Sequence, residues 1–279
     1  MGFKDILVHV RPHAVDGEPV QVALRLAAGH GARLTGLLTL RDLAMLKLLY
    51  PSSAAIVEQR VQEAARLATE VEDRLRTLAD SAGVGFGFQV GEGDTAELLG
   101  LAGRYHDLVV IGQTDPGTEE LGIDVPEAAL GTCGRPVLVV PRQGTFPVVG
   151  RHVLVAWNGS RESARAVQAA LPFIALAERI TVLLGRSKER YPSITRRPPV
   201  DIAVHLARHA GPGCAPVEAV PLEVPEAEAG AAILRQAAAR GADLLVMGAY
   251  GRSWLREWAL GGATRHVLRN APLPVLMAH

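Results

Sequence analysis

The sequence predicts an α/β protein with two tandem open parallel five-stranded sheets, each covered by helices on both faces. Short apolar runs of strand length alternate with longer amphipathic segments, which is the pattern of a parallel sheet built through helical crossovers. The same order of segments occurs twice in 279 residues. Apolar residues make up 48% of the chain but aromatic residues only 4%, so Ala, Val and Leu must fill the cores. That composition is typical of strands buried on both faces.

An internal repeat divides the chain into two halves. Three segments of the first half recur in the second: residues 4–10 as 151–157, 107–112 as 243–248, and 135–141 as 273–279. A repeat of this length is a whole domain rather than the unit of a solenoid. We therefore predict domains at residues 1–142 and 151–279, joined by a linker at residues 143–150 that contains Pro147 and two glycines.

Each half is expected to alternate strand and helix, with right-handed crossovers. In the first half we expect strands at residues 5–10, 33–39, 85–90, 108–112 and 137–140, and helices at residues 20–29, 56–82, 95–104 and 126–132. In the second half we expect strands at residues 153–156, 180–184, 217–220, 244–248 and 275–277, and helices at residues 162–176, 201–209, 227–240 and 262–270. The long helix 56–82 carries its apolar residues on one face, which predicts a surface helix packed on a sheet.

Charge and hydropathy exclude several classes of function. Lys plus Arg and Asp plus Glu number 29 each, so the formal charge is zero and nothing favours binding to a nucleic acid or an anionic membrane. The longest apolar runs are far shorter than the about 20 residues of a membrane helix. The N-terminus enters a strand pattern without a signal peptide, so a cytoplasmic protein is expected. Cys133 and Cys214 have no metal-ligand spacing and are expected to be reduced thiols.

A glycine-rich segment follows the fourth strand of the second half. Its glycines, Gly248, Gly251, Gly261 and Gly262, have the spacing Gly-x2-Gly-x9-Gly-Gly. The first ends a buried strand at the edge where ligands of open α/β sheets bind, and the last two open the final helix. Free amides at a helix start attract anions, and the hydroxyl of Thr264 could donate to a phosphate. This spacing favours an anion site over plain turn chemistry.

The segment resembles the Gly-x2-Gly-x9-Gly-Ser/Thr signature with which nucleotide-binding universal stress proteins hold ATP. Two further segments support the resemblance: residues 270–277, similar to the end of the family's domain, and residues 153–160, similar to its strand ending in Asp-Gly-Ser. The resemblance extends over nearly the whole chain, once per half, and is closer in the second half. It implies a tandem universal stress protein with a Rossmann-like fold, that of the adenine nucleotide alpha hydrolase-like proteins.

The resemblance also implies a site for an adenine nucleotide, ATP, with Mg²⁺ as a candidate companion. Phosphate contacts are implied at Gly248, Gly251, Gly261, Gly262 and Thr264. Adenine or ribose contacts are implied around Ala156, Trp157 and Asn158, and near Leu183 at the end of the second strand. Three residues adjoining these positions complete the predicted set: Met247, Tyr250 and Ala263.

Two positions depart from the family's pattern. Gly262 stands where the family usually has Ser or Thr, so one hydroxyl donor to phosphate is missing. Asn158 stands where the family usually has Asp, so an amide replaces a carboxylate that would bind a ribose hydroxyl or a metal. Backbone amides can still hold phosphates, but each lost hydrogen bond to a charged group costs about 1.5–3 kcal/mol of affinity.

The first half is expected to be a degenerate copy that binds no nucleotide. Gly131-Thr132 resembles the second Gly-Ser/Thr pair, but Asp115 and Pro116 stand where the second glycine belongs. The segment between them is acidic, and a carboxylate facing a phosphate is repulsive. We expect this half to pair with the second half through the edge strands 137–140 and 275–277, which would otherwise stay exposed. A homodimer of the whole chain is a further alternative.

The predicted function is nucleotide binding and stress-response signalling, with slow hydrolysis or none. No Walker lysine follows the glycines and no Ser/His/Asp order suggests a nucleophile, so no catalytic residue is predicted. The nine histidines form no set with carboxylates at metal-ligand spacing, so no metal site is predicted. Two alternatives remain open: an interaction module that needs no nucleotide, and a slow ATP hydrolase. Fold alone does not decide between them.

Overall fold

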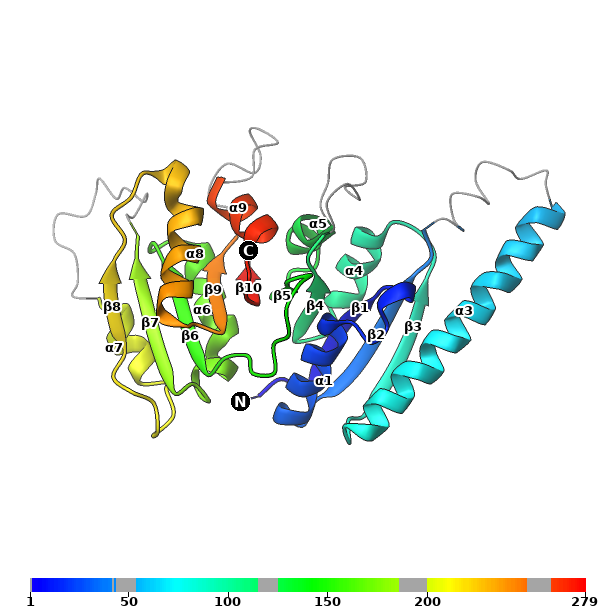
Figure 1. Ribbon diagram of the computed structural model, residues 1–279, viewed down its shortest axis with the longest axis horizontal. Helices are drawn as coiled ribbons and strands as arrows, with labels where there is room; N and C mark the ends of the chain where they lie inside the picture. Colours follow the sequence, from blue (N-terminus) through cyan, green and yellow to red (C-terminus); the bar gives the residue numbers. More distant parts are fainter. Residues whose placement is uncertain (1, 42, 44–53, 115–124, 186–199, 250–261) are drawn as a thin grey trace. The chain divides into compact units, whose positions relative to one another are not determined.

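The computed structural model describes residues 2–41, 43, 54–114, 125–185, 200–249 and 262–279. The chain divides into two compact units, Gly2–Thr145 and Phe146–His279. Figure 1 draws the elements of each unit. Each unit is considered on its own below.

The N-terminal unit is a parallel sheet with helices on both faces. Its described strands lie in the order β3-β2-β1-β4-β5, and every pairing among them is parallel. The elements are β1 (Asp5–Val10), η1 (Pro12–Ala14), α1 (Glu18–His30), β2 (Arg33–Thr39), α3 (Ala54–Ser81), β3 (Phe86–Gly91), α4 (Thr95–Gly103), β4 (Leu108–Gly112), α5 (Val125–Thr132) and β5 (Val137–Val140).

The C-terminal unit repeats this plan. Its described strands lie in the order β10-β9-β6-β7-β8, again all parallel. The elements are β6 (His152–Trp157), α6 (Arg161–Ile174), β7 (Arg179–Leu184), α7 (Ile202–Ala207), β8 (Glu218–Pro221), η3 (Glu226–Glu228), α8 (Ala229–Arg240), β9 (Leu244–Gly248), α9 (Gly262–Asn270) and β10 (Val275–Ala278). The predicted fold class is confirmed, and the expected strands and helices end within two residues of those observed.

The central strands form the core of each unit. In β1 the residues Ile6, Leu7 and Val8 are completely buried, and so are all residues from Leu244 to Val246 in β9. Consecutive strand residues point to opposite faces of a sheet, so burial of neighbours requires cover on both sides. The continuous apolar runs in the sequence therefore follow from the parallel topology.

The long helix α3 packs on the sheet through only part of its length. Val71, Leu75 and Ala79 are at most 2% exposed, whereas Ile56 is 56% and Val61 37% exposed. A helix of 28 residues is about 42 Å long, whereas a strand of 7 residues is about 23 Å long. The first half of α3 therefore extends past the strands, and the predicted packing of a surface helix on the sheet is confirmed for the second half.

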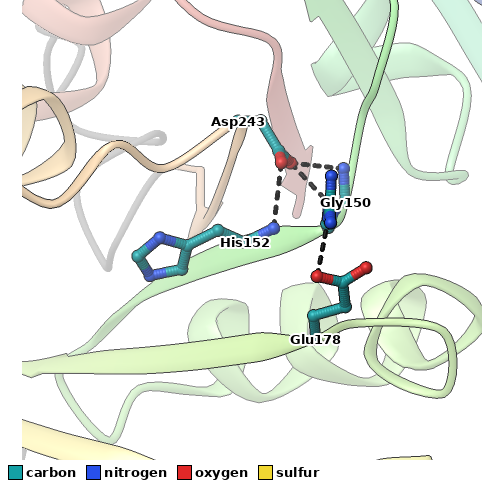
Figure 2. Close-up of polar contacts among 5 residues, drawn as sticks. Gly150, His152, Glu178 and Asp243 are labelled. Atoms are coloured by element: carbon teal, nitrogen blue, oxygen red, sulfur yellow. Dashed lines mark hydrogen bonds and ion pairs between the residues drawn. The ribbon is translucent and has the colours of Figure 1, made fainter. Parts of the chain in front are cut away.

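A half-buried carboxylate fixes the start of β6 (Figure 2). Asp243, just before β9, accepts backbone N–H bonds from Gly150 at 2.6 Å, Arg151 at 3.0 Å and His152 at 2.9 Å. Burial raises the pKa of Asp243, and the three backbone donors act in the opposite direction. Asp107 does the same in the N-terminal unit, where it accepts from Lys4 and Asp5. The contact between this aspartate and the start of the neighbouring strand therefore occurs in both halves of the repeat.

Loss of the Asp243 carboxylate should destabilise the C-terminal unit. Asp243→Ala leaves three backbone donors without their acceptor, and we expect the free energy of unfolding to fall by about 1–3 kcal/mol. Urea unfolding measures this change. The matched control is Glu178→Ala, which removes the ion pair with Arg151 shown in the same view; both side chains are at least 60% exposed, so no measurable change is expected. Equal effects of the two substitutions would contradict the assignment.

Candidate functional site

The carboxyl ends of β6, β7 and β9 meet at one edge of the C-terminal sheet. Ala156 in β6 is paired with Met247 in β9, and Trp157 with Leu184 in β7. The helices α6 and α9 both begin just after this edge of the sheet, following β6 and β9 in the chain (Figure 1). Strand ends and helix starts of this kind form the usual ligand crevice of open α/β sheets, and helix starts favour anions.

The turn from β6 to α6 is held by its own side chains. Gly159 has a φ of 74°, a conformation that favours glycine. The Asn158 side-chain oxygen accepts from the backbone N–H of Ser160 at 3.1 Å, and the Ser160 hydroxyl accepts from the N–H of Ser163 at 3.1 Å. The amide at Asn158 therefore supports the turn as a carboxylate would. The sequence analysis did not single out the Ser160 cap, although a serine directly before a helix is its usual signal.

Gly248, at the end of β9, allows α6 to approach closely. A Cβ at this position would lie 2.6 Å from the backbone carbon of Glu162 and 2.6 Å from the nitrogen of Ser163. Gly112 takes the equivalent place in the N-terminal unit, where a Cβ would lie 3.1 Å from Cγ of Pro19 in the first turn of α1. The close approach to backbone atoms at Gly248 gives this glycine a role in packing between strand and helix, and Gly112 has a similar but less crowded position.

The first turn of α9 offers the open part of the site. Gly262 is exposed, and a Cβ there would meet no atom of the described residues within 4 Å. Thr264 is only 5% exposed, and none of the described residues hydrogen-bonds to its hydroxyl. The helix α9 packs closely against α8 at Gly230. A Cβ on Gly230 would lie 2.8 Å from Cβ of His266 and 3.0 Å from the carbonyl oxygen of Ala263. Packing thus holds the amides of this turn in place.

The remaining predicted residues divide into three groups. Ala156, Trp157 and Ala263 are half-buried at the edge. Leu183 and Met247 are 1% and 5% exposed, so their side chains lie in the core, and the half-buried neighbours Leu184 and Gly185 line the edge instead. Gly185 is tied to the site, since its N–H donates to the carbonyl of Trp157 at 2.8 Å. Three predicted residues lie outside the described part of the chain: Tyr250, Gly251 and Gly261.

The corresponding edge of the N-terminal unit is arranged differently. Gly131 and Thr132 are the last residues of α5, so their likeness to the second glycine pair, which begins a helix, was misleading. The side chain of Arg11 lies over the end of β4 and donates to the carbonyl of Gln113 at 3.0 Å. A protein side chain thus covers the strand end here. The predicted Asp115 and Pro116 lie outside the described residues.

A short polar chain lies beside Arg11. His9 shares a hydrogen bond with Thr39 at 3.2 Å, and Thr39 with Thr95 at 3.0 Å. Burial lowers the pKa of His9 to about 4, and the nearby Arg11 guanidinium contributes to the lowering. The imidazole is therefore neutral at pH 7.

Comparison with known proteins agrees with this architecture. Residues 150–279 match the model of the universal stress protein family. A universal stress protein from Archaeoglobus fulgidus has a similar structure, with a TM-score of 0.71 and 16% identity over 98% of this chain and 95% of that one. A universal stress protein from Pseudomonas aeruginosa gives a TM-score of 0.59 and 16% identity over 99% and 93%. A universal stress protein solved in complex with cAMP matches 51% of this chain and 100% of its own, with a TM-score of 0.37 and 19% identity. No curated protein matches the sequence.

The C-terminal half is thus a universal stress protein domain, as its residues match the family model. The fold of the whole chain is similar to that of universal stress proteins, because it matches such structures over nearly their entire length. Among the residues that the structure describes, no helix is both long and apolar enough to cross a membrane.

The packing role of Gly248 can be tested by adding one methyl group. Gly248→Ala forces the backbone of α6 away from β9, and overpacking of this kind costs about 1–3 kcal/mol of stability. Gly262→Ala is the control, because its Cβ enters open space. Thermal unfolding should show a lower Tm for the first variant alone. A Gly248→Ala protein as stable as the wild type would mean that the space beside β9 is free for a ligand.

The buried imidazole of His9 should make stability depend on pH. An unfolded His titrates near pH 6.5 and the folded His9 near pH 4, so the unfolded state binds more protons between these values. This contribution is complete above about pH 6.5 and is lost as the pH falls toward 4, by up to roughly 3 kcal/mol. Urea unfolding at several pH values should show a shallower pH dependence for His9→Gln than for the wild type. Parallel profiles would contradict the assignment.

Proposed function

We propose that the C-terminal domain binds an adenine nucleotide, with ATP as the ligand, and that binding rather than turnover is its activity in the stress response. The observation that carries the proposal is the meeting of three backbone segments at one sheet edge. These are the capped turn at residues 158–160, the end of β9 and the open first turn of α9. Backbone amides at a helix start and glycines at a strand end suit a polyphosphate.

Each segment has a distinct part in the proposed complex. The amides of Gly262 and Ala263 would donate to phosphate oxygens, and the hydroxyl of Thr264 would add one side-chain donor. The base and ribose would lie toward Trp157 and Gly185, where the ends of β6 and β7 are joined by a hydrogen bond. Phosphate recognition thus depends mainly on the backbone, which explains how the site could tolerate a glycine at position 262.

A metal ion would enter this site with the nucleotide. Within the described part of the chain, no three acidic, histidine or cysteine side chains gather to hold an ion. Mg²⁺ would therefore be bound chiefly by phosphate oxygens, as is common for this ion. The N-terminal domain, with Arg11 over its strand end, would act as the pairing partner that the sequence predicts.

Position 262 gives a sharp test, because changes there leave the fold intact. Gly262→Ser restores the hydroxyl that the family usually carries and should tighten ATP binding about tenfold, as one further hydrogen bond to a charged group would. Gly262→Asp puts a carboxylate against the phosphates and should weaken binding by at least as much. Isothermal titration calorimetry with ATP measures both changes. The control Gly131→Ser has equally open space but lies in the N-terminal domain, and should leave the affinity unchanged.

The alternatives predict other results. An interaction module that needs no nucleotide would give no heat with ATP in any of these variants. A hydrolase would release phosphate steadily, and the Gly262→Asp protein would lose that release. Titration with AMP and cAMP separates the contribution of the phosphate contacts to affinity from that of the base and ribose contacts. A ligand without β- and γ-phosphates should gain little affinity from Gly262→Ser.

A further inference from the structure

Two exposed histidines lie about one turn apart, one in the short helix α7 and the other in the turn that follows it. His205 and His209 have ring centroids 4.9 Å apart, with an interplanar angle of 61°. We propose that these two side chains form a chelate for one borderline transition-metal ion such as Zn²⁺ or Cu²⁺. The sequence predicted no metal site, because no set of histidines and carboxylates completed one. The proposal does not depend on nucleotide binding.

The backbone around the pair is well defined by hydrogen bonds. Asp201 caps the helix start by accepting from the N–H of Ala203 at 2.8 Å. The helical turn continues past the last α7 residue, because the N–H groups of His209 and Ala210 both donate to the carbonyl of Leu206, at 2.9 and 3.0 Å. Leu206 is fully buried and anchors this turn, which leaves the two imidazoles exposed on the same side.

The spacing of the rings suits a shared ion. If each imidazole binds through a nitrogen at about 2.0–2.1 Å and the two bonds meet near the tetrahedral angle, the ring centres lie roughly 5 Å apart. The observed separation of the ring centres, 4.9 Å, is close to this value. Imidazole nitrogen is a preferred donor for Zn²⁺, Cu²⁺ and Ni²⁺, whereas Mg²⁺ and Ca²⁺ prefer oxygen. The site should discriminate against the ion that accompanies a nucleotide.

The pair lies away from the candidate nucleotide edge. Beyond His209, Gly211 approaches the carbonyl of Ala175 just past the end of α6, and Ala215 donates to the carbonyl of Glu178 just before β7. These contacts belong to the amino edge of the sheet, whereas the nucleotide site is proposed at the carboxyl edge. No third His, Cys, Asp or Glu of the described residues joins the pair, so water would complete the coordination.

A competing account is that the rings simply pack edge to face. Such a contact supports a helix by a few tenths of a kcal/mol and needs no ion. The two accounts differ in how the histidines depend on each other. In a chelate, the second imidazole binds an ion already held by the first, so removing either one loses the gain from high effective concentration. In simple packing, each histidine would bind ions weakly and independently.

Zinc titration of the untagged full chain, without nucleotide, tests the proposal. We expect one Zn²⁺ per chain, and a loss of affinity of at least tenfold in His205→Gln and equally in His209→Gln. The control His13→Gln changes another exposed histidine, in the turn Pro12–Ala14, and should leave zinc binding unchanged. Electron paramagnetic resonance of the Cu²⁺-loaded wild type should show two equivalent imidazole nitrogens. The proposal would be overturned if zinc binding survived when both His205 and His209 are replaced by Gln. A Cu²⁺ spectrum that shows only one coordinating imidazole nitrogen would overturn it as well.

Discussion

The first turn of α6 packs directly against the last residue of β9, and this close approach determines the geometry of the candidate site. A Cβ on Gly248 would lie 2.6 Å from backbone atoms of Glu162 and Ser163. The approach brings the Asn158–Ser160 turn next to the end of β9. The helix α9 is the next described element after β9 in the chain. Gly112 has a similar but less crowded position in the N-terminal domain, where a Cβ would lie 3.1 Å from a side-chain atom of Pro19. The candidate site thus lies beside a close packing contact between α6 and β9.

The two domains share this packing contact but differ in what covers the strand ends. In the N-terminal domain Arg11 lies over the end of β4 and binds the carbonyl of Gln113. In the C-terminal domain the first turn of α9 begins with the exposed Gly262, and the hydroxyl of Thr264 has no hydrogen-bond partner among the residues that the structure describes. Duplication thus preserved the sheet, its buried runs and the Asp107 and Asp243 contacts, while the residues at the carboxyl edge diverged. Divergence at that edge changes binding with little effect on the core.

The sequence predicted the architecture well because buried parallel strands leave a strong signal. Short continuous apolar runs such as Leu244–Val246 are typical of strands covered on both faces, and the repeat indicated two similar halves. The site was harder to predict. The sequence suggested that Gly248 lets a ligand approach the backbone. Its steric role depends on the neighbouring helix α6, and the sequence alone does not show which helix packs there. Gly131-Thr132 matched a motif but ends a helix instead of beginning one, and Leu183 is buried, like its neighbour Val182, because the sheet is covered on both faces.

The proposed function requires that backbone amides of the C-terminal domain hold the phosphates of a nucleotide. Amide chemical shifts of ¹⁵N-labelled protein, followed during titration with ATP and Mg²⁺, show whether they do. We expect the largest shifts at residues 158–160 and 262–264, with the signals of Arg11 and Gln113 unchanged. If saturating ATP left the amides of 262–264 unmoved, or shifted those of the N-terminal domain instead, these amides would not be the phosphate ligands.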